Sequence, residues 1–170
     1  MITGAWSVIF YGRPRASHDI DFVVDLHPQD VDWAVRAIEK LPSEFLIQKD
    51  MVSEGIRKKG LFQIIHQPTL LKVDVWLLTD DAFDQSRFQR KKTVMILDTH
   101  IVISSAEDTI LQKLRWYKDA TIEKHIVDAA CVYQIQGDRL DKKYMKLWAD
   151  KLKVTKYLNQ LDTMDLEQYM

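Results

Sequence analysis

The run DIDFVV, residues 19–24, places two carboxylates inside an apolar segment that has the composition of a buried strand. Side chains alternate between the two faces of a strand, so Asp19 and Asp21 share one face while the intervening apolar side chains pack on the other. Two like charges beside a core repel each other and lose hydration, so the pair needs a compensating cation. Carboxylate oxygens suit Mg²⁺, and the spacing therefore predicts a divalent metal site. The alternative is that both aspartates, with Asp25, are solvated at the open end of the strand.

Two further features favour the metal site over that alternative. The apolar run 70–78 carries Asp74, and if it forms the neighbouring strand, about 4.8 Å away, Asp74 completes a three-carboxylate cluster. Upstream, residues 4–12 read GAWSVIFYG, a small-residue turn that leads into a short helix. A helix N-terminus reached through glycine exposes backbone N–H groups and the positive end of the helix dipole, which suits a phosphate chain. The order of these motifs points to one site that combines carboxylates with an anion-binding turn.

In these motifs the chain resembles the DNA polymerase β-like nucleotidyltransferase superfamily, and within it the minimal bacterial enzymes related to abortive-infection toxins. The matching segments are the Gly4-Ala5 turn, residues 12–21, residues 72–75, the helix opening at 105–108 that carries residues 113–115, and Asp128. The likeness covers most of the chain. It implies a metal-dependent enzyme that moves an NMP unit from an NTP such as ATP to a hydroxyl on RNA, protein or a small molecule, with Mg²⁺ or Mn²⁺ as cofactor.

Two departures from the family pattern concern the N-terminal turn. Relatives usually have Gly-Gly or Gly-Ser where this chain has Gly4-Ala5, so a serine hydroxyl that would hold a phosphate is absent, and Thr3 or Ser7 is expected to replace it. Relatives also have a helix and most of a strand before the turn, where this sequence has residues 1–3. We therefore expect a shortened first strand, with nucleotide affinity as the property most affected.

The resemblance also implies roles for the acidic residues and the turn. Asp19 and Asp21 would bridge two metal ions, and Asp74 would bind the ion nearest the acceptor and help to deprotonate its hydroxyl. The backbone amides of Gly4 and Ala5 would hold the triphosphate.

Several charged residues outside the strands are candidates for phosphate contacts. Arg13 and Arg15 flank the turn, and guanidinium groups bind phosphate through paired donors; an equal alternative is that Arg15 balances Asp19. Lys113 lies early in a helix and is expected either to reach the NTP phosphates or to be an ordinary surface lysine. Asp128 is expected to form a salt bridge within a helical bundle, and the alternative is a catalytic role.

The periodicity of the chain predicts an α+β fold, in which a small mixed β-sheet is flanked by helices and followed by a C-terminal helical bundle. We assign residues 1–103 to a catalytic core and residues 104–170 to a helical region. Strands are predicted at 45–47, 61–65, 70–78, 94–97 and 101–103, and helices at 28–41, 51–58, 80–90, 106–118, 123–136, 140–150 and 154–161.

Composition excludes several classes of protein. The chain has 170 residues and a net charge of −1, with no apolar run near the roughly 20 residues that cross a bilayer, so we expect a cytoplasmic protein without membrane contact. Without a global positive field, no recognition of DNA sequence is expected. The basic stretch 138–156 is either a solvated helical face or a contact with RNA or a nucleotide phosphate. The single Cys131 is expected to be a buried, inert thiol, and zinc is not supported.

The sequence leaves the partners open. By analogy with the toxin members of the family, we expect NTP as substrate, a tRNA or protein acceptor, and an antitoxin partner in a toxin–antitoxin or phage-defence setting. One alternative is a catalytically degenerate nucleotide-binding or partner-binding protein with the same fold. Another is a metal phosphohydrolase that uses the same carboxylates and releases phosphate from NTP without labelling an acceptor.

Overall fold

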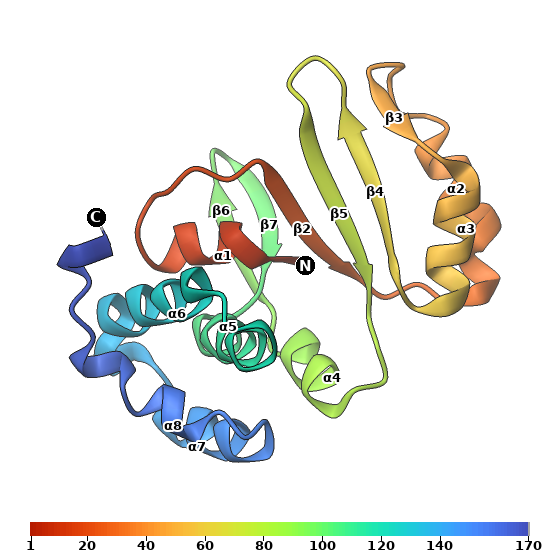
Figure 1. The fold of residues 1–170 in the computed structure, drawn as a ribbon. Helices are drawn as coiled ribbons and strands as arrows, with labels where there is room; N and C mark the ends of the chain where they lie inside the picture. Colours follow the sequence, from red (N-terminus) through yellow and green to blue (C-terminus); the bar gives the residue numbers. More distant parts are fainter. Residues whose placement is uncertain (170) are drawn as a thin grey trace.

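The structure, a computed structural model, describes residues 1–169 and has the α+β architecture that the sequence predicts (Figure 1). Its centre is a seven-stranded mixed sheet with the order β3-β4-β5-β2-β1-β7-β6. The strands are β1 Ile2–Thr3, β2 Asp19–Val24, β3 Phe45–Ile47, β4 Leu61–His66, β5 Leu71–Leu77, β6 Lys92–Ile96 and β7 Thr99–Ile103. The α-helices are α1 Gly4–Tyr11, α2 Val31–Ile38, α3 Lys49–Lys58, α4 Ala82–Gln89, α5 Ala106–Ala120, α6 Glu123–Gln136, α7 Lys142–Lys151 and α8 Thr155–Leu158.

Strand pairing brings the predicted carboxylate strands together. β2 and β5 are parallel neighbours, and Asp21 lies directly opposite Asp74 in their register. β4 pairs antiparallel with β5, as the short connection between them predicts. β1 is only two residues long, yet it pairs antiparallel with β2 and parallel with β7, so it ties the two halves of the sheet together.

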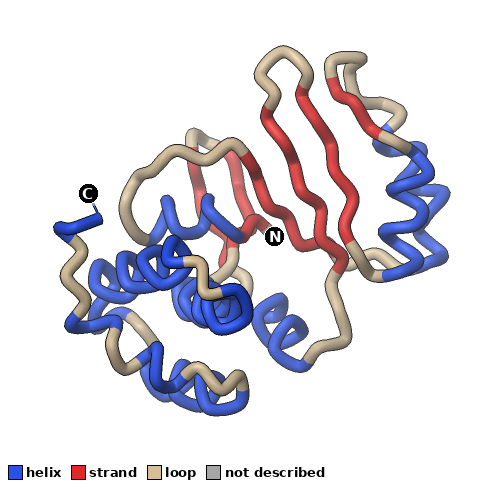
Figure 2. Tube along the Cα trace, in the orientation of Figure 1, coloured by secondary structure: helices blue, strands red, loops and turns tan. Residues whose placement is uncertain are grey.

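Helices gather at two sides of the sheet (Figure 2). The amphipathic α2 and its neighbour α3 bury Val31, Val52 and Ile56 against Val75 of β5, which confirms that the helix predicted after Pro28 covers a sheet face. Alternate residues of β5 take part in this core, so the positions between them, including Asp74, face the other side of the sheet.

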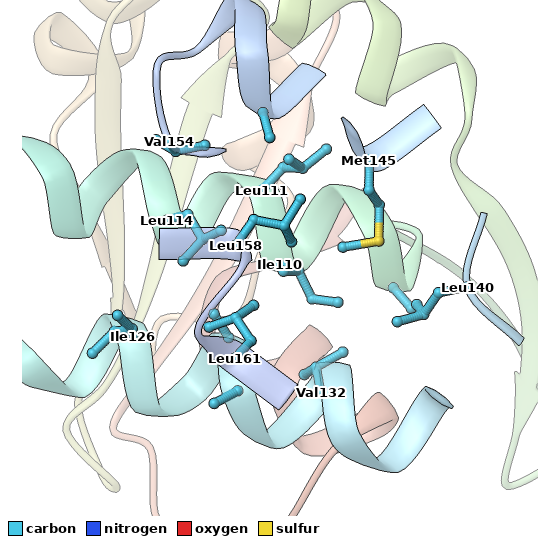
Figure 3. Packing of buried hydrophobic residues seen from close by; sticks show 14 of the residues in the cluster. Ile110, Leu111, Leu114, Ile126, Val132, Leu140, Met145, Val154, Leu158 and Leu161 are labelled. Carbon is cyan, nitrogen blue, oxygen red and sulfur yellow. The ribbon is translucent and has the colours of Figure 1, made fainter. Parts of the chain in front are cut away.

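On that other side, a second core joins the helices that follow the sheet. Its fully buried side chains include Leu111 and Leu114 of α5, Val132 of α6 and Met145 of α7 (Figure 3). Val8 of α1 belongs to the same core, so the turn that precedes α1 is fixed by packing against the C-terminal helices. In residues 1–169, none of the helices has the length and apolar character needed to traverse a bilayer.

Two local predictions need correction. The turn between β6 and β7 is centred on Leu97 and Asp98, which have φ values of 47° and 60°, so residue 97 lies outside the strand predicted at 94–97. Residues 99–100 belong to β7, which begins before the predicted residue 101. An apolar leucine at a left-handed position is not a usual turn residue, and the sequence therefore did not reveal this turn. The last predicted helix, 154–161, is the single turn α8, followed by a short 3₁₀ helix at Leu161–Thr163. Ser105 caps α5 as expected, because its Oγ accepts a hydrogen bond from the Asp108 N–H at 3.1 Å.

Candidate functional site

The three predicted carboxylates lie in a row on one face of the sheet. Asp21 and Asp74 are in register on parallel strands, and Asp19 precedes Asp21 by two residues on the same face. Trp76 Nε1 donates to Asp21 Oδ1 at 3.3 Å, and Gln63 Nε2 donates to Asp74 Oδ1 at 2.8 Å. Burial raises the pKa of Asp21, and repulsion from the neighbouring carboxylates raises it further, against the hydrogen bond from Trp76. The fold therefore holds negative charge where its own environment disfavours it.

The donor set matches the chemistry of a hard divalent cation, but the side chains are not gathered around one point. Asp19 and Asp21 line a common cavity, whereas Asp74 is turned toward Gln63. Within residues 1–169, no group of three His, Cys, Asp or Glu side chains lies close enough together to hold one ion. Since Asp21 and Asp74 already oppose each other on adjacent strands, side-chain rotation is the change that would bring these oxygen donors together.

The glycine turn lies directly against the second carboxylate. Gly4 has a left-handed φ of +63°, and a Cβ at this position would lie 1.9 Å from Asp21 Oδ2. No other amino acid fits here without moving the turn or the carboxylate. Gly4 and Ala5 line the same cavity as Asp19 and Asp21, so the N-terminus of α1 opens beside the carboxylate pair.

The Ser7 hydroxyl does not lie in the cavity, where the sequence predicted that it would hold a phosphate. Its side chain is fully buried, and its Oγ donates to the Gly4 carbonyl at 2.9 Å, so the hydroxyl stabilises the turn from beneath. Thr3 is also buried, at 4% exposure. The helical geometry after Gly4 directs the hydroxyl of the fourth residue back toward the turn.

Arg15, Lys113 and Asp128 form a buried ionic network beside the carboxylates. Arg15 donates to both oxygens of Asp128, through Nε at 3.0 Å and a terminal nitrogen at 2.9 Å. Lys113 Nζ lies 2.7 Å from Asp128 Oδ2. Asp128 is therefore the predicted salt-bridge residue, and Arg15 balances Asp128 and not Asp19.

Lys113 is not a surface lysine, because only 4% of it is exposed. Burial lowers the pKa of its ammonium group, and the attraction of Asp128 opposes that shift. The side chain lines the cavity that contains Asp19 and Asp21, so this part of the cavity carries a fixed cation.

Arg13 lies outside that cavity. It lines a different hollow together with Cys131, where burial raises the pKa of the thiol. Arg15 lines both hollows, so of the two arginines of the loop only Arg15 lies beside the carboxylates.

The carboxylate cavity has a volume of about 380 Å³, within the usual range of small-molecule sites. Sequence reasoning assigned no place in the site to seven of its lining residues, namely Ser17, Trp76, Trp116, Asp119, Ala120, Lys124 and His125. Trp76 could have been found from the alternation of β5, because it is two residues beyond Asp74. Lys124 and His125 reach the site only because α6 packs against α5, which no local pattern reveals.

The aromatic residues of the C-terminal helices divide into two groups. Tyr117 packs edge-to-face on Tyr157, and Trp148 packs on Phe83, as expected for contacts between helices. Trp116 instead lines the carboxylate cavity and pairs with His125, with ring centroids 5.4 Å apart.

Comparison with known proteins supports the fold. No known family profile matches the sequence, and no curated protein matches it. Among solved structures, an antigenic nucleotidyltransferase-like protein from Paracoccidioides brasiliensis is similar, with a TM-score of 0.50 and 15% sequence identity. The match covers 93% of this chain and 83% of that protein. The chain therefore has a nucleotidyltransferase-like fold.

Proposed function

We propose that this protein is a metal-dependent nucleotidyltransferase that moves an NMP unit from an NTP to a hydroxyl acceptor. The observation that carries the proposal is the contact between the Gly4 turn and Asp21, in a cavity that also contains Asp19 and the buried Lys113. A phosphate-binding turn has no reason to lie against a carboxylate unless a cation neutralises the two anions that meet there.

In the proposed reaction, the acceptor oxygen attacks the α-phosphorus, the bond from that phosphorus to the bridging oxygen breaks, and pyrophosphate leaves. Asp19 and Asp21 would hold Mg²⁺ or Mn²⁺, and the bound ion would supply positive charge against the charge that develops on the phosphate oxygens. Asp74, once released from Gln63, would accept the proton of the acceptor hydroxyl.

The basic network provides the remaining phosphate contacts. Arg15, Lys113 and Asp128 together carry one net positive charge when all are ionised, and Arg15 and Lys113 line the cavity. Because Asp128 fixes both cations, the site keeps its charge in place before substrate binds. The N–H groups at the start of α1 complete the cradle for the triphosphate.

The direct test is transfer of label. Wild-type protein is incubated with each α-³²P-labelled NTP, Mg²⁺ or Mn²⁺, total RNA and cell lysate, beside an Asp19→Ala/Asp21→Ala variant and an Asp25→Ala control. Asp25 is an exposed aspartate just beyond β2, so this control removes a carboxylate without touching the cavity. Label transferred by wild type and Asp25→Ala alone is expected. Release of phosphate from NTP without labelled acceptor would instead favour a phosphohydrolase.

A second candidate is a nucleotide-binding protein that no longer turns over. One observation favours it: within residues 1–169, Asp19, Asp21 and Asp74 do not lie close enough together to bind one metal ion. Metal-dependent NTP binding by a folded protein that labels no acceptor would support this candidate.

We extend the proposal, by analogy alone, to a toxin–antitoxin or phage-defence role with tRNA or a protein as acceptor and an antitoxin as partner. Growth arrest on expression of the wild type, and none with Asp19→Ala/Asp21→Ala, is the expected result. Equal growth of both strains at matched protein levels would contradict the extension.

A further inference from the structure

A second cavity, of about 280 Å³, adjoins the carboxylate cavity. The two share Trp76, Trp116 and Asp119, which form the boundary between them. Val23 of β2 also lines the second cavity, two residues beyond Asp21 on the same strand face. The second cavity is therefore adjacent to the place where phosphates at the Gly4 turn would lie.

The charged side chains sum to zero in both cavities, because three acidic and three basic residues line the first and two of each line the second, but the cations are paired differently. The carboxylate cavity contains Lys113, whose network carries a net positive charge. In the second cavity the arginines are balanced, since Arg87 Nε donates to Asp84 Oδ1 at 2.8 Å and an Arg115 terminal nitrogen donates to Asp81 Oδ1 at 3.1 Å. Each arginine of the second cavity has an aspartate of its own, whereas Arg15 and Lys113 share Asp128, so the second cavity has no spare cation for a phosphate chain and suits an uncharged polar group better.

Gln112 supplies a polar group without a partner in the second cavity. The residue is 7% exposed and lines the cavity, and its Oε1 is buried without a hydrogen bond from any described residue. Buried amide oxygens are normally hydrogen-bonded, so this oxygen has unused acceptor capacity for a ligand donor that reaches it. Arg115, one turn further along α5, has guanidinium N–H groups beyond the one bonded to Asp81.

We propose that the second cavity binds the nucleobase of the NTP. Trp76 and Trp116 supply flat apolar surfaces for a planar ring, and the amide of Gln112, with Arg115, reads the donor and acceptor groups on its edge. The volume suits one ring system. The inference rests on the proposed function, because it takes the triphosphate to lie at the Gly4 turn.

The test separates base binding from phosphate binding. Calorimetry with Mg²⁺ measures the affinity of wild type, Gln112→Leu and Gln112→Met for non-hydrolysable analogues of the four NTPs and for inorganic tripolyphosphate. Leu and Met keep the volume and helix propensity of Gln and remove its polar atoms. Gln89→Leu is the matched control, since Gln89 is exposed at the end of α4 and outside both cavities. Thermal melting verifies that each variant folds.

We expect wild type and Gln89→Leu to bind at least one NTP analogue about tenfold more tightly than tripolyphosphate. Each Gln112 variant should lose most of that difference in affinity, while its affinity for tripolyphosphate stays unchanged. Equal binding of tripolyphosphate and all four analogues, or analogue affinities that the Gln112 variants leave unchanged, would overturn the inference and leave the proposed function standing. A folded wild type that binds none of these ligands with Mg²⁺ would contradict the proposed function itself.

Discussion

Replacing Asp128 with asparagine is expected to destabilise the protein through the two cations that share its carboxylate. Asp128 and Lys113 are each 5% exposed at their side chains, whereas Arg15 is 23% exposed. Breaking a buried ion pair by removing one partner costs about 3–5 kcal/mol, because the other charge remains buried. Arg15 reaches solvent and adds roughly 0–1 kcal/mol.

Lys113 limits the loss because it can release its proton. Burial already lowers its pKa in the wild type, and removing Asp128 removes the attraction that opposes this shift. We therefore expect a loss near the lower bound, about 3 kcal/mol, which corresponds to a fall in Tm of roughly 6–12 °C for a chain of this size.

The same linkage fixes the sign of the pH dependence. A lysine whose pKa is lower in the folded than in the unfolded state destabilises the folded protein at every pH below its unfolded pKa. That penalty decreases as pH rises from the folded pKa toward the unfolded value of 10.5. The deficit of Asp128→Asn relative to wild type should therefore shrink between pH 7 and pH 9.5.

Urea unfolding monitored by circular dichroism measures the loss in the free energy of unfolding. Asp150→Asn, at an exposed position of α7, is the matched control, and its free energy of unfolding is expected within about 0.5 kcal/mol of wild type. Adding Lys113→Met to Asp128→Asn should restore part of the stability, because it removes the uncompensated ammonium. An Asp128→Asn protein as stable as the control, or a deficit that grows with pH, would refute the reasoning.

Three further predictions follow from single positions. Gly4→Ala should destabilise the protein by at least about 1–2 kcal/mol, because its φ is left-handed and a Cβ would meet Asp21, and it should abolish nucleotidyl transfer. Gly60→Ala is the control: Gly60 has open space and no left-handed φ, so this variant should melt near the wild-type temperature. Asp21→Asn should raise Tm at pH 7, because an aspartate whose pKa is raised by folding destabilises the folded protein at pH values above that pKa; the gain should vanish below the unfolded pKa of 3.8. Mg²⁺ should raise the Tm of wild type only, and a Mg²⁺ shift retained by the variant would contradict the metal assignment. Burial raises the pKa of Cys131, so at pH 7.5 it should react with a disulfide reagent more slowly than a free thiol does; equal rates would show an exposed thiolate.

Local patterns predict the elements of this fold closely. The strand 45–47 and the helix 123–136 have the predicted bounds, because alternation and helical spacing are complete within each segment. From the sequence alone, the neighbouring position of the two carboxylate strands is only a condition, and the parallel pairing of β2 and β5 meets it.

The side-chain partners in the site could not be predicted in the same way. Arg15 and Asp128 are 113 residues apart in sequence, and their pairing depends on how α6 packs against α1 and α5. A charged residue alone does not reveal whether its partner is a phosphate, a metal or another side chain. Asp74 shows the same limit, because its bond to Gln63 comes from the antiparallel register of β4 and β5.

The position of Asp21 gives the strongest reason to look for function at this sheet face. Its carboxylate is partly buried, lies beside two others and presses against a glycine in a left-handed conformation. Burial of the carboxylate and its repulsion by the two others disfavour the folded protein, and neither is required by the apolar core on the opposite face. A sheet selected only for stability would place an apolar residue or an amide here. Unfavourable charge at one point, within a well-packed fold, is expected where binding of a cation compensates it.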